Sequence, residues 1–570
     1  METLASYMAE GLGADIASIR LLLSLSMGYP IAFIYNLKSS SWKVSYRHIY
    51  LFICGVLLFL WNFGFDIVHM FIGIFATMFV NYRFKHSNIA VMFAFVFNMG
   101  YLVIGSHICN RGTYDINWTT PYCVLCLRMI GLSWDLYDAS KSESQQSASQ
   151  KKSALSKFPG VLETLAFSFT PTAFLTGPQF PMRHFQAFID ETLRPKFSLK
   201  KSTFKDRFID NPRYRRTLVR FVLGYIGVIV LSKWLSMYPA DTMLTHEFQY
   251  EWSFFSRLLY IIIFGQLVLL RYVSIWLIAE GSCVLIGLGC TGFVHIKSKG
   301  SQQLPDCVKK TQQSNMLTRN GPVLERRDSG IDWSCADSYI KSHAELFDPT
   351  QMIICEAPHT ACANISLTRY IFATNTDDLV AGFNINTNRW LLVYVYKRLR
   401  FLGNKNLSQL ISLLFLALWH GTYTGYYLNF GIELLVMTVE KDFLFILKNS
   451  KYHDFFYQTL IGRLISSVCG KLHVYFLLSS PMVAFYLLKF HLWFPVLKSV
   501  YFIGLWYIFW PLIKPMVKYL LPSSKTSSPQ LSTMQTSESS SQLSVTTNGD
   551  VISVVDQHQL QHQLSSKKQQ

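Results

Sequence analysis

The chain has 570 residues, of which 51% are hydrophobic, 15% aromatic and only 15% charged. Soluble proteins of ordinary composition carry about 25% charged residues, and the mean hydropathy here is +0.24, so a soluble globular domain is excluded. The formal net charge of +18 is explained by basic loops on the cytosolic side of a membrane rather than by a nucleic-acid partner, because no nucleic-acid-reading motif accompanies it.

Apolar runs long enough to cross a bilayer recur along the chain. A spanning helix needs roughly 20 residues, and lipid forces each spanning backbone to satisfy its own hydrogen bonds. The clearest runs lie at residues 21–37, 49–65, 90–108, 218–237, 258–289, 407–430, 472–488 and 496–519. Weaker ones lie at 63–79, 122–134, 161–174, 431–447 and 455–469. We expect an all-α polytopic membrane protein with about ten to twelve transmembrane or re-entrant helices.

Two polar segments interrupt this pattern. Residues 297–348 predict a long polar loop, and residues 522–570 are rich in Ser, Gln and Thr. Such a composition does not bury a core, so we expect a disordered cytosolic tail. Lys567 and Lys568 stand fourth and third from the end, as in the dilysine signal that returns membrane proteins to the endoplasmic reticulum.

His420 is an ionisable residue in a run that is otherwise almost wholly apolar and aromatic, residues 415–427 (FLALWHGTYTGYY). Such groups are costly in lipid and have either a function or a structural partner. Tyr423, Thr424 and Tyr427 follow at helical spacings of three, four and seven. They predict a polar, aromatic face that lines a cavity. Other ionisable residues inside apolar runs fit structural pairs: Arg271, Glu280 and Glu433.

Several short motif matches have weaker support. Cys123 and Cys126 have the spacing of a redox or metal pair, but no second pair accompanies them, and we expect no metal. Residues 287–292 match GxGxxG inside an apolar run without a βαβ unit, which favours close helix packing. Asn117 and Asn364 begin glycosylation sequons that would be modified only if luminal.

Three segments together resemble the signature of the membrane-bound O-acyltransferase family: residues 382–390 (GFNINTNRW), 396–403 (YKRLRFLG) and 416–421 (LALWHG). The family pairs an asparagine, followed here six residues later by a tryptophan, with the histidine of a Trp-His-Gly motif. Asn384, Trp390 and His420 fill these places, and 36 residues separate Asn384 from His420. Residues 177–185 (GPQFPMRHF) and 132–135 (LSWD) resemble blocks of the lysophosphatidylcholine acyltransferase branch.

The resemblance covers most of residues 1–521 and implies a membrane catalytic domain there, with helices around a buried reaction chamber. It implies a multi-pass enzyme of the endoplasmic reticulum membrane, an acyl-CoA-dependent O-acyltransferase of the 1-acylglycerophosphocholine type. Such an enzyme transfers an acyl chain, expected to be polyunsaturated, to the free sn-2 hydroxyl of a lysophospholipid in phospholipid remodelling. Acyl-CoA is then a co-substrate, with no permanently bound cofactor.

Lysophosphatidylcholine, lysophosphatidylethanolamine and lysophosphatidylserine are the acceptors that the resemblance implies. Two other functions remain open. A protein or peptide O-acyltransferase of the same superfamily would share the histidine. A transporter would also place histidines and carboxylates inside a membrane, although no internal repeat is evident in the sequence.

The resemblance also assigns roles to residues. His420 is the expected general base, since neutral imidazole has a pKa of about 6.5 and can remove the proton of an attacking hydroxyl. Asn384 is expected to orient that hydroxyl or to donate to the thioester oxyanion. The expected substrate-binding residues are Trp390, Tyr423, Thr424, Tyr427, Gln179 and Arg183. The CoA phosphates are assigned to Lys397, Arg398 and Arg400, which otherwise only flank a membrane segment.

Overall fold

The computed structural model describes residues 2–109, 116–191, 212–290 and 359–524, together with three short strands between residues 294 and 356. The chain forms two compact units. The first unit consists of residues 1–365, 384–431 and 479–501, and the second of residues 366–383, 432–478 and 502–570. Two long helices contribute residues to both units, namely α19 (Thr424–Lys448) and α21 (Leu460–Leu487).

The N-terminal part of the first unit is a set of apolar helices around one buried helix, α6. Its helices are α1 (Glu2–Leu12), α2 (Ile16–Lys38), α3 (Val44–Phe63), α4 (Ile67–Arg83), α5 (Asn88–Cys109), α6 (Thr119–Asp138), α7 (Ala148–Ser153), α8 (Val161–Ser168) and α9 (Met182–Ile189), with the short 3-10 turns η1 (Ser39–Ser41) and η2 (Gly64–Asp66). Sixteen of the twenty residues of α6 are buried, which is the pattern of a helix with neighbours all round. Both α4 and α5 pack against it.

Polar side chains mark where several of these helices begin. The carboxylate of Asp15 accepts the N–H of Ser18 at 2.7 Å at the start of α2. In the same way Asn404 accepts two backbone N–H groups at the start of α18 (Lys405–His420). Such caps satisfy N–H groups that have no partner inside the helix, and each stabilises a helix by about 1 kcal/mol.

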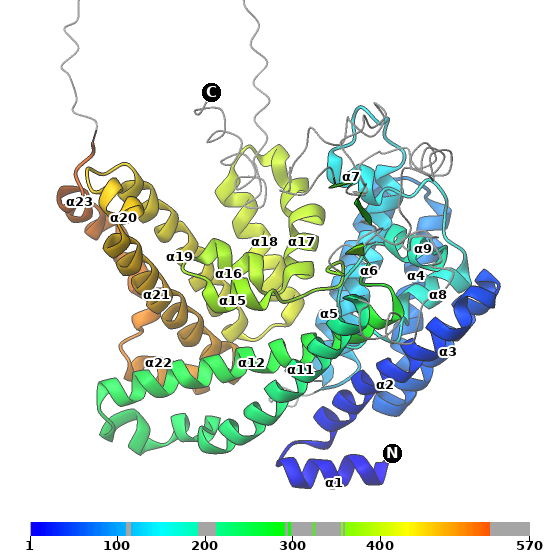
Figure 1. Cartoon of the computed structure of the whole chain (residues 1–570), viewed down its shortest axis with the longest axis horizontal. Helices are drawn as coiled ribbons and strands as arrows, with labels where there is room; N and C mark the ends of the chain where they lie inside the picture. The colour runs from blue at the N-terminus through cyan, green and yellow to red at the C-terminus, as the bar shows by residue number, and fades with distance from the viewer. Residues whose placement is uncertain are drawn as a thin grey trace, which may run out of the picture. The chain divides into compact units, whose positions relative to one another are not determined.

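Helices α11 (Pro212–Met237) and α12 (Phe254–Ile286) lie side by side (Figure 1). A Cβ atom on Gly227 would come within 2.2 Å of the Ser274 hydroxyl oxygen, so any larger residue there would displace the Ser274 side chain. The carboxylate of Glu280, wholly buried, pairs with Arg216 at 2.7 Å and with Arg220 at 3.0 Å. The prediction that Glu280 belongs to a structural pair is therefore confirmed.

The connection between α11 and α12 holds η3 (Ala240–Leu244) and a π-helical turn, η4 (Glu247–Glu251). After α12, three short strands, β1 (Val294–Lys297), β2 (Val323–Leu324) and β3 (Cys355–Glu356), form an antiparallel sheet in the order β2-β1-β3. These strands were not expected from the sequence. Apart from them, the predicted polar loop at 297–348 lies outside the described residues, as does the predicted tail from residue 525 onward.

The C-terminal part of the first unit contains α17 (Ile385–Tyr394), the 3-10 helix η6 (Tyr396–Leu402), α18, the first turns of α19, the end of α21 and α22 (Phe490–Ser499). The second unit contains α15 (Leu367–Phe372), α16 (Thr376–Gly382), α20 (His453–Gln458), η7 (Ile503–Phe509) and α23 (Trp510–Leu520), with the remainder of α19 and α21. Its own small buried cluster is formed by Ala373, Leu379 and Val474.

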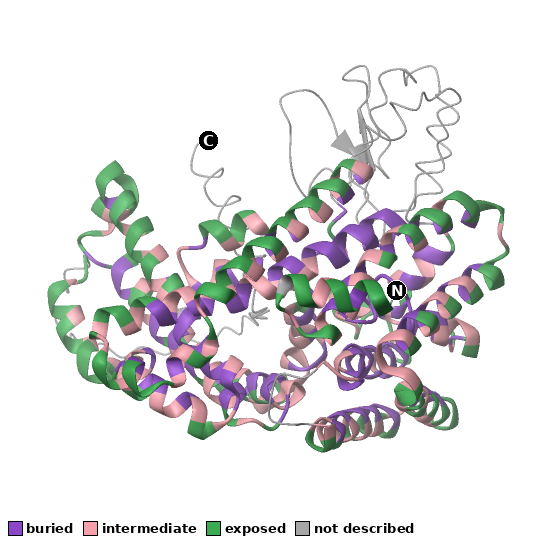
Figure 2. Cartoon of the chain, turned by 90° about the horizontal axis from the view of Figure 1, so that it is seen from below, coloured by how far each residue is buried: buried purple, intermediate pink, exposed green. Residues whose placement is uncertain are grey.

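The predicted all-α polytopic membrane architecture is confirmed in its coarse form. Within the described part of the chain, six helical runs are long and apolar enough to cross a membrane: Ile16–Ser41, Val44–Arg83, Asn88–Cys109, Arg213–Leu244, Phe254–Ile286 and Leu460–Leu487. The number becomes seven if Phe490–Ser499 and Ile503–Leu520 are counted as one span. Many helices are buried on one side and exposed on the other (Figure 2). Exposed side chains such as Phe79 and Val96 suit contact with lipid.

Candidate active site

His420 is the last residue of α18, and the helix does not continue past it. Gly421 adopts a φ of +136°, in a region that favours glycine, and α19 begins only at Thr424. The prediction that Tyr423, Thr424 and Tyr427 share a helical face with His420 is therefore wrong. The chain turns at Gly421 before another helical turn can form.

The imidazole of His420 is surrounded by aromatic rings. Its centroid lies 4.7 Å from that of Trp419, 5.5 Å from those of Tyr426 and Phe430, and 5.1 Å from that of Phe485. The residue is partly exposed, and no described residue hydrogen-bonds to either of its ring nitrogens. A titratable ring in an apolar wall, without a partner from the protein, is available to a substrate.

Asn384 carries its amide on a turn at the start of α17. Its φ of +51° and ψ of +41° place it in the left-handed region, where asparagine occurs more readily than most residues. Its carbonyl accepts the N–H of Asn388 at 3.0 Å, the first hydrogen bond of the helix. The side chain makes no capping bond, and no described residue hydrogen-bonds to it. Asn384 therefore resembles His420 in having an unengaged polar group.

Two tryptophans fix the motif segments to α6. The indole N–H of Trp390 donates to the carbonyl of Leu127 at 3.0 Å, and that of Trp419 donates to the carbonyl of Cys123 at 3.1 Å. The two acceptors are four residues apart, which is about one helical turn. The two motif segments are thus anchored on adjacent turns of one buried helix. Trp390 is 4% exposed, which favours an anchoring role over the predicted contact with substrate.

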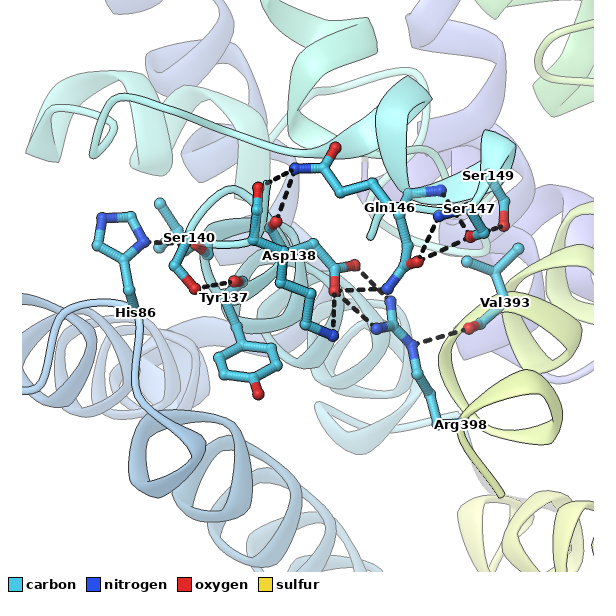
Figure 3. A network of polar contacts seen from close by, with 12 residues as sticks. His86, Tyr137, Asp138, Ser140, Gln146, Ser147, Ser149, Val393 and Arg398 are labelled. Carbon is cyan, nitrogen blue, oxygen red and sulfur yellow. Dashed lines mark hydrogen bonds and ion pairs between the residues drawn. The ribbon is translucent and has the colours of Figure 1, made fainter. Parts of the chain in front are cut away.

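Arg398 is joined to the C-terminal end of α6 (Figure 3). Its guanidinium makes two hydrogen bonds to the carboxylate of Asp138, at 2.7 and 2.5 Å, and lies 4.1 Å above the ring of Trp134. The Asp138 side chain is wholly buried, and Gln150 also donates to it at 2.8 Å. A bidentate pair of this kind fixes the orientation of an arginine. The pair favours a structural role for Arg398 over contact with a CoA phosphate.

The other two basic residues assigned to CoA lie on the same short helix, η6. Lys397 is partly exposed and Arg400 is exposed. No ion pair involves Lys397 within the described part of the chain. Contact of these two residues with CoA phosphates stays a prediction.

The block at residues 132–135 holds the end of α17. The phenol of Tyr394 donates to the carboxylate of Asp135 at 2.8 Å, and Asp135 is 1% exposed. The hydroxyl of Ser133 accepts from the amide of Asn81 at 2.8 Å. This block therefore positions α17, the helix that follows Asn384.

The two predicted substrate-binding residues of the 177–185 block have different environments. Gln179 is 9% exposed, and its amide oxygen has no hydrogen-bond partner among the described residues. Arg183 is exposed and donates to the carbonyl of Lys151 at 2.7 Å. Gln179 fits a buried binding surface, whereas Arg183 serves to join α9 to α7.

Thr424 is engaged by the protein as well. Its hydroxyl accepts the indole N–H of Trp493 at 3.0 Å, and the N–H of Gly425 donates to the carbonyl of Leu488 at 3.0 Å. The start of α19 is thereby fixed against the end of α21 and α22. Tyr423 and Tyr427 are partly exposed, and their predicted contacts with substrate stay predictions.

Arg128 was not singled out from the sequence. It is 1% exposed, and its guanidinium donates to four backbone carbonyls, those of Phe167, Ser168, Ala173 and Pro178. A charged residue inside the apolar run 122–134 was the available signal, because buried charges in a membrane domain need partners. Arg128 holds the loop that leads into the 177–185 block.

No group of three or more His, Cys, Asp or Glu side chains within the described ranges is placed to hold a metal ion. Cys123 and Cys126 are free thiols of α6. The Cys126 thiol is buried, and Cys123 lies beside the backbone of Trp419.

Comparison with known proteins identifies the family to which the motif segments point. The family model described as "MBOAT, membrane-bound O-acyltransferase family" matches residues 103–472. The chain is 32% identical to lysophospholipid acyltransferase 5 of Rattus norvegicus over 500 residues, which cover 87% of this chain and 88% of the relative. The Homo sapiens protein of the same name is also 32% identical, over 503 residues and the same shares. A lysophospholipid acyltransferase of Saccharomyces cerevisiae is 26% identical over 455 residues, 75% of this chain and 62% of that protein. The predicted resemblance is confirmed, and the chain belongs to the membrane-bound O-acyltransferase family.

Proposed function

We propose that the protein is a lysophospholipid acyltransferase. It transfers an acyl chain, polyunsaturated by preference, from acyl-CoA to the free sn-2 hydroxyl of a lysophospholipid such as lysophosphatidylcholine. Relatives that align over most of the chain are named for lysophospholipid acylation. The observation that carries the proposal is the pair of unengaged polar groups, on His420 and Asn384, whose segments are both anchored to α6.

In this proposal a neutral His420 accepts the proton of the lysophospholipid hydroxyl as its oxygen attacks the thioester carbon. The new C–O ester bond forms, the C–S bond breaks, and the proton passes to the departing CoA thiolate. Asn384 donates its amide N–H to the oxyanion, and a donor of this kind contributes a factor of about 10² to 10³. The aromatic rings around His420 exclude water, which competes with the hydroxyl for the thioester.

The other substrate contacts that the family resemblance implies belong to the same proposal. Tyr423, Tyr427 and Gln179 are proposed to contact the lipid substrates. Lys397 and Arg400 are proposed to contact the CoA phosphates, because exposed cations attract a phosphate-rich headgroup. Acyl-CoA acts as a co-substrate and no cofactor is held permanently. Lysophosphatidylcholine, lysophosphatidylethanolamine and lysophosphatidylserine are the proposed acceptors.

The finer architecture belongs to the same proposal. About ten to twelve transmembrane or re-entrant helices surround a buried reaction chamber when shorter helices such as α6 and α18 are counted. Residues 1–521 form the catalytic domain, residues 522–570 form a cytosolic tail that carries the dilysine pair Lys567 and Lys568, and the enzyme resides in the endoplasmic reticulum membrane.

The test is acyl transfer in microsomes that contain the intact chain or His420→Ala at matched expression. Arachidonoyl-CoA is the donor, and the acceptors are the three lysophospholipids and a hydroxyl-bearing peptide. We expect phospholipid product from the intact chain and a rate about 10² to 10⁴ lower for His420→Ala. His491→Ala is the matched control, because His491 is exposed and lies outside the motif segments.

Three results of this assay would contradict the proposal, each in a different way. Equal rates for the intact chain and His420→Ala would show that the histidine is structural. Transfer to the peptide alone would identify a protein acyltransferase instead. No transfer to any acceptor, with the chain present in the membrane, would reject acyl transfer to these acceptors altogether.

A further inference from the structure

The start of α17 is capped by a residue from outside the helix. The first N–H groups of a helix have no partner within it, and an asparagine at the N-cap ordinarily accepts one of them with its side chain. Asn384 occupies the N-cap but does not do so. Instead, the N–H of Ile385 donates to the backbone carbonyl of Asn364 at 3.1 Å, and the N–H of Asn386 donates to the side-chain oxygen of Asn364 at 3.2 Å.

A third hydrogen bond strengthens this connection. The side-chain amide of Asn386 donates to the carbonyl of Ala363 at 3.1 Å, so the start of α17 donates three hydrogen bonds to residues 363 and 364. Asn364 is 5% exposed. Its amide nitrogen would lie 3.7 Å from a Cβ atom on Gly177, the glycine that begins the 177–185 block. Asn364 therefore lies between two of the blocks that carry the family resemblance.

We propose that Asn364 is a positioning residue for acyl transfer, which caps α17 in place of Asn384 and so keeps the Asn384 amide free for the reacting group. The inference rests on the proposed role of Asn384. A side chain that satisfies the helix N-terminus has its acceptor oxygen occupied and its orientation fixed by the helix. Because Asn364 supplies that acceptor, Asn384 can keep its left-handed backbone and leave both ends of its amide unengaged.

The same geometry bears on the sequon at Asn364-Ile-Ser366. Glycosylation requires access to the amide nitrogen of the asparagine, and this side chain is almost wholly buried with its oxygen engaged by Asn386. The predicted sequon is therefore not a modification site in the folded protein. Ser366 offers a control, because Ser366→Ala removes the sequon and leaves Asn364 in place.

Three purified full-length variants test the proposal: Asn364→Ala, Asn364→Asp and Ser366→Ala. Alanine removes the capping oxygen, and small displacements of a reacting group cost up to about 10²-fold in rate. We expect kcat of Asn364→Ala to fall about ten- to a hundredfold with KM values for both substrates within about twofold. Aspartate keeps an acceptor of the same shape near a helix N-terminus that favours negative charge, so Asn364→Asp is expected to recover most of the loss. Ser366→Ala is expected to match the intact enzyme.

Hydrogen exchange provides a readout that does not depend on turnover. The amides at the start of α17 are expected to exchange faster in Asn364→Ala than in the intact protein, and Asn364→Asp is expected to restore their protection. An unchanged kcat in Asn364→Ala, unchanged exchange, or a folded but inactive Asn364→Asp would each overturn the proposal. So would a glycosidase-sensitive mass that is lost in Ser366→Ala.

The failure of this inference can be told apart from failure of the proposed function. If the intact enzyme transfers acyl chains and His420→Ala does not, while Asn364→Ala is fully active, only the positioning role is rejected. If the intact protein transfers no acyl chain to any acceptor, both the function and the positioning role are rejected.

Discussion

His420 in the first unit and His473 in the second occupy opposite chemical environments. The ring of His420 packs against aromatic neighbours and has no hydrogen-bond partner within the described ranges. His473 uses both ring nitrogens: Nε2 lies 3.1 Å from a carboxylate oxygen of Glu440, and Nδ1 lies 3.0 Å from the hydroxyl of Tyr507. One tautomer, which donates from Nε2 and accepts at Nδ1, satisfies both contacts.

Glu440, the carboxylate partner of His473, accepts further hydrogen bonds from the protein. Glu440 is 7% exposed and accepts both the backbone N–H of Thr376, at 2.9 Å, and its hydroxyl, at 2.8 Å. Buried polar groups that are fully hydrogen-bonded make a structure rigid, whereas an unsatisfied one costs stability and needs another explanation. If the proposed role of His420 holds, the hydrogen-bond partners of a histidine, rather than its burial, separate a structural role from a chemical one.

Replacing each histidine by alanine tests this distinction, with turnover and thermal stability as the two measurements. His420→Ala should lower turnover by about 10² to 10⁴ and lower the thermal unfolding midpoint less than His473→Ala, because it loses ring contacts but no hydrogen bond. His473→Ala should do the reverse, because it removes one donor to the buried Glu440 carboxylate and the acceptor of the Tyr507 hydroxyl. Turnover per folded molecule and thermal unfolding of the detergent-purified variants measure both. A loss of stability in His420→Ala as large as that in His473→Ala would refute the distinction.

Glu440 offers a sharper test of the structural side. Glu440→Ala removes a buried acceptor from Thr376 and from His473, and we expect a loss of about 3 kcal/mol in unfolding free energy. Glu440→Gln keeps the shape and one acceptor oxygen for Thr376, so its cost should be about 1 kcal/mol. Denaturant unfolding of the two variants measures the difference. Equal losses would mean that volume, and not hydrogen bonding, matters at this position.

The sequence singled out the proposed reacting residues through motifs, but it was a poorer guide to their surroundings. His420 and Asn384 were identified because short motifs specify residue type and spacing. The helical face after His420 was wrong because periodicity assumes that a helix continues, although the glycine of Trp-His-Gly was the visible sign of a break. The membrane class followed from composition alone, since apolar runs of spanning length leave few other folds.

Residues that act through long-range contacts were not predicted. Arg128 holds backbone carbonyls some forty to fifty positions away, and Asn364 caps a helix twenty residues later in the chain. Neither contact leaves a local pattern, because both depend on how distant segments fold together. For the same reason Arg398 was grouped with its basic neighbours by sequence, although it is paired with Asp138.

The last pair of variants separates two of the three basic residues of η6, Arg398 and Lys397. Arg398→Lys keeps the charge but loses the bidentate contact with Asp138 and the stacking on Trp134, so stability should fall by about 1 to 2 kcal/mol while KM for acyl-CoA stays within about twofold. Lys397→Ala should leave stability unchanged and raise KM for acyl-CoA a few-fold, about the effect of one exposed phosphate contact near a membrane. Thermal unfolding and initial rates across a range of acyl-CoA concentrations distinguish the two variants. Arg398→Lys could instead raise KM for acyl-CoA without loss of stability. That result would mean that the Arg398 guanidinium of the intact enzyme binds CoA and that its pair with Asp138 opens when the substrate arrives.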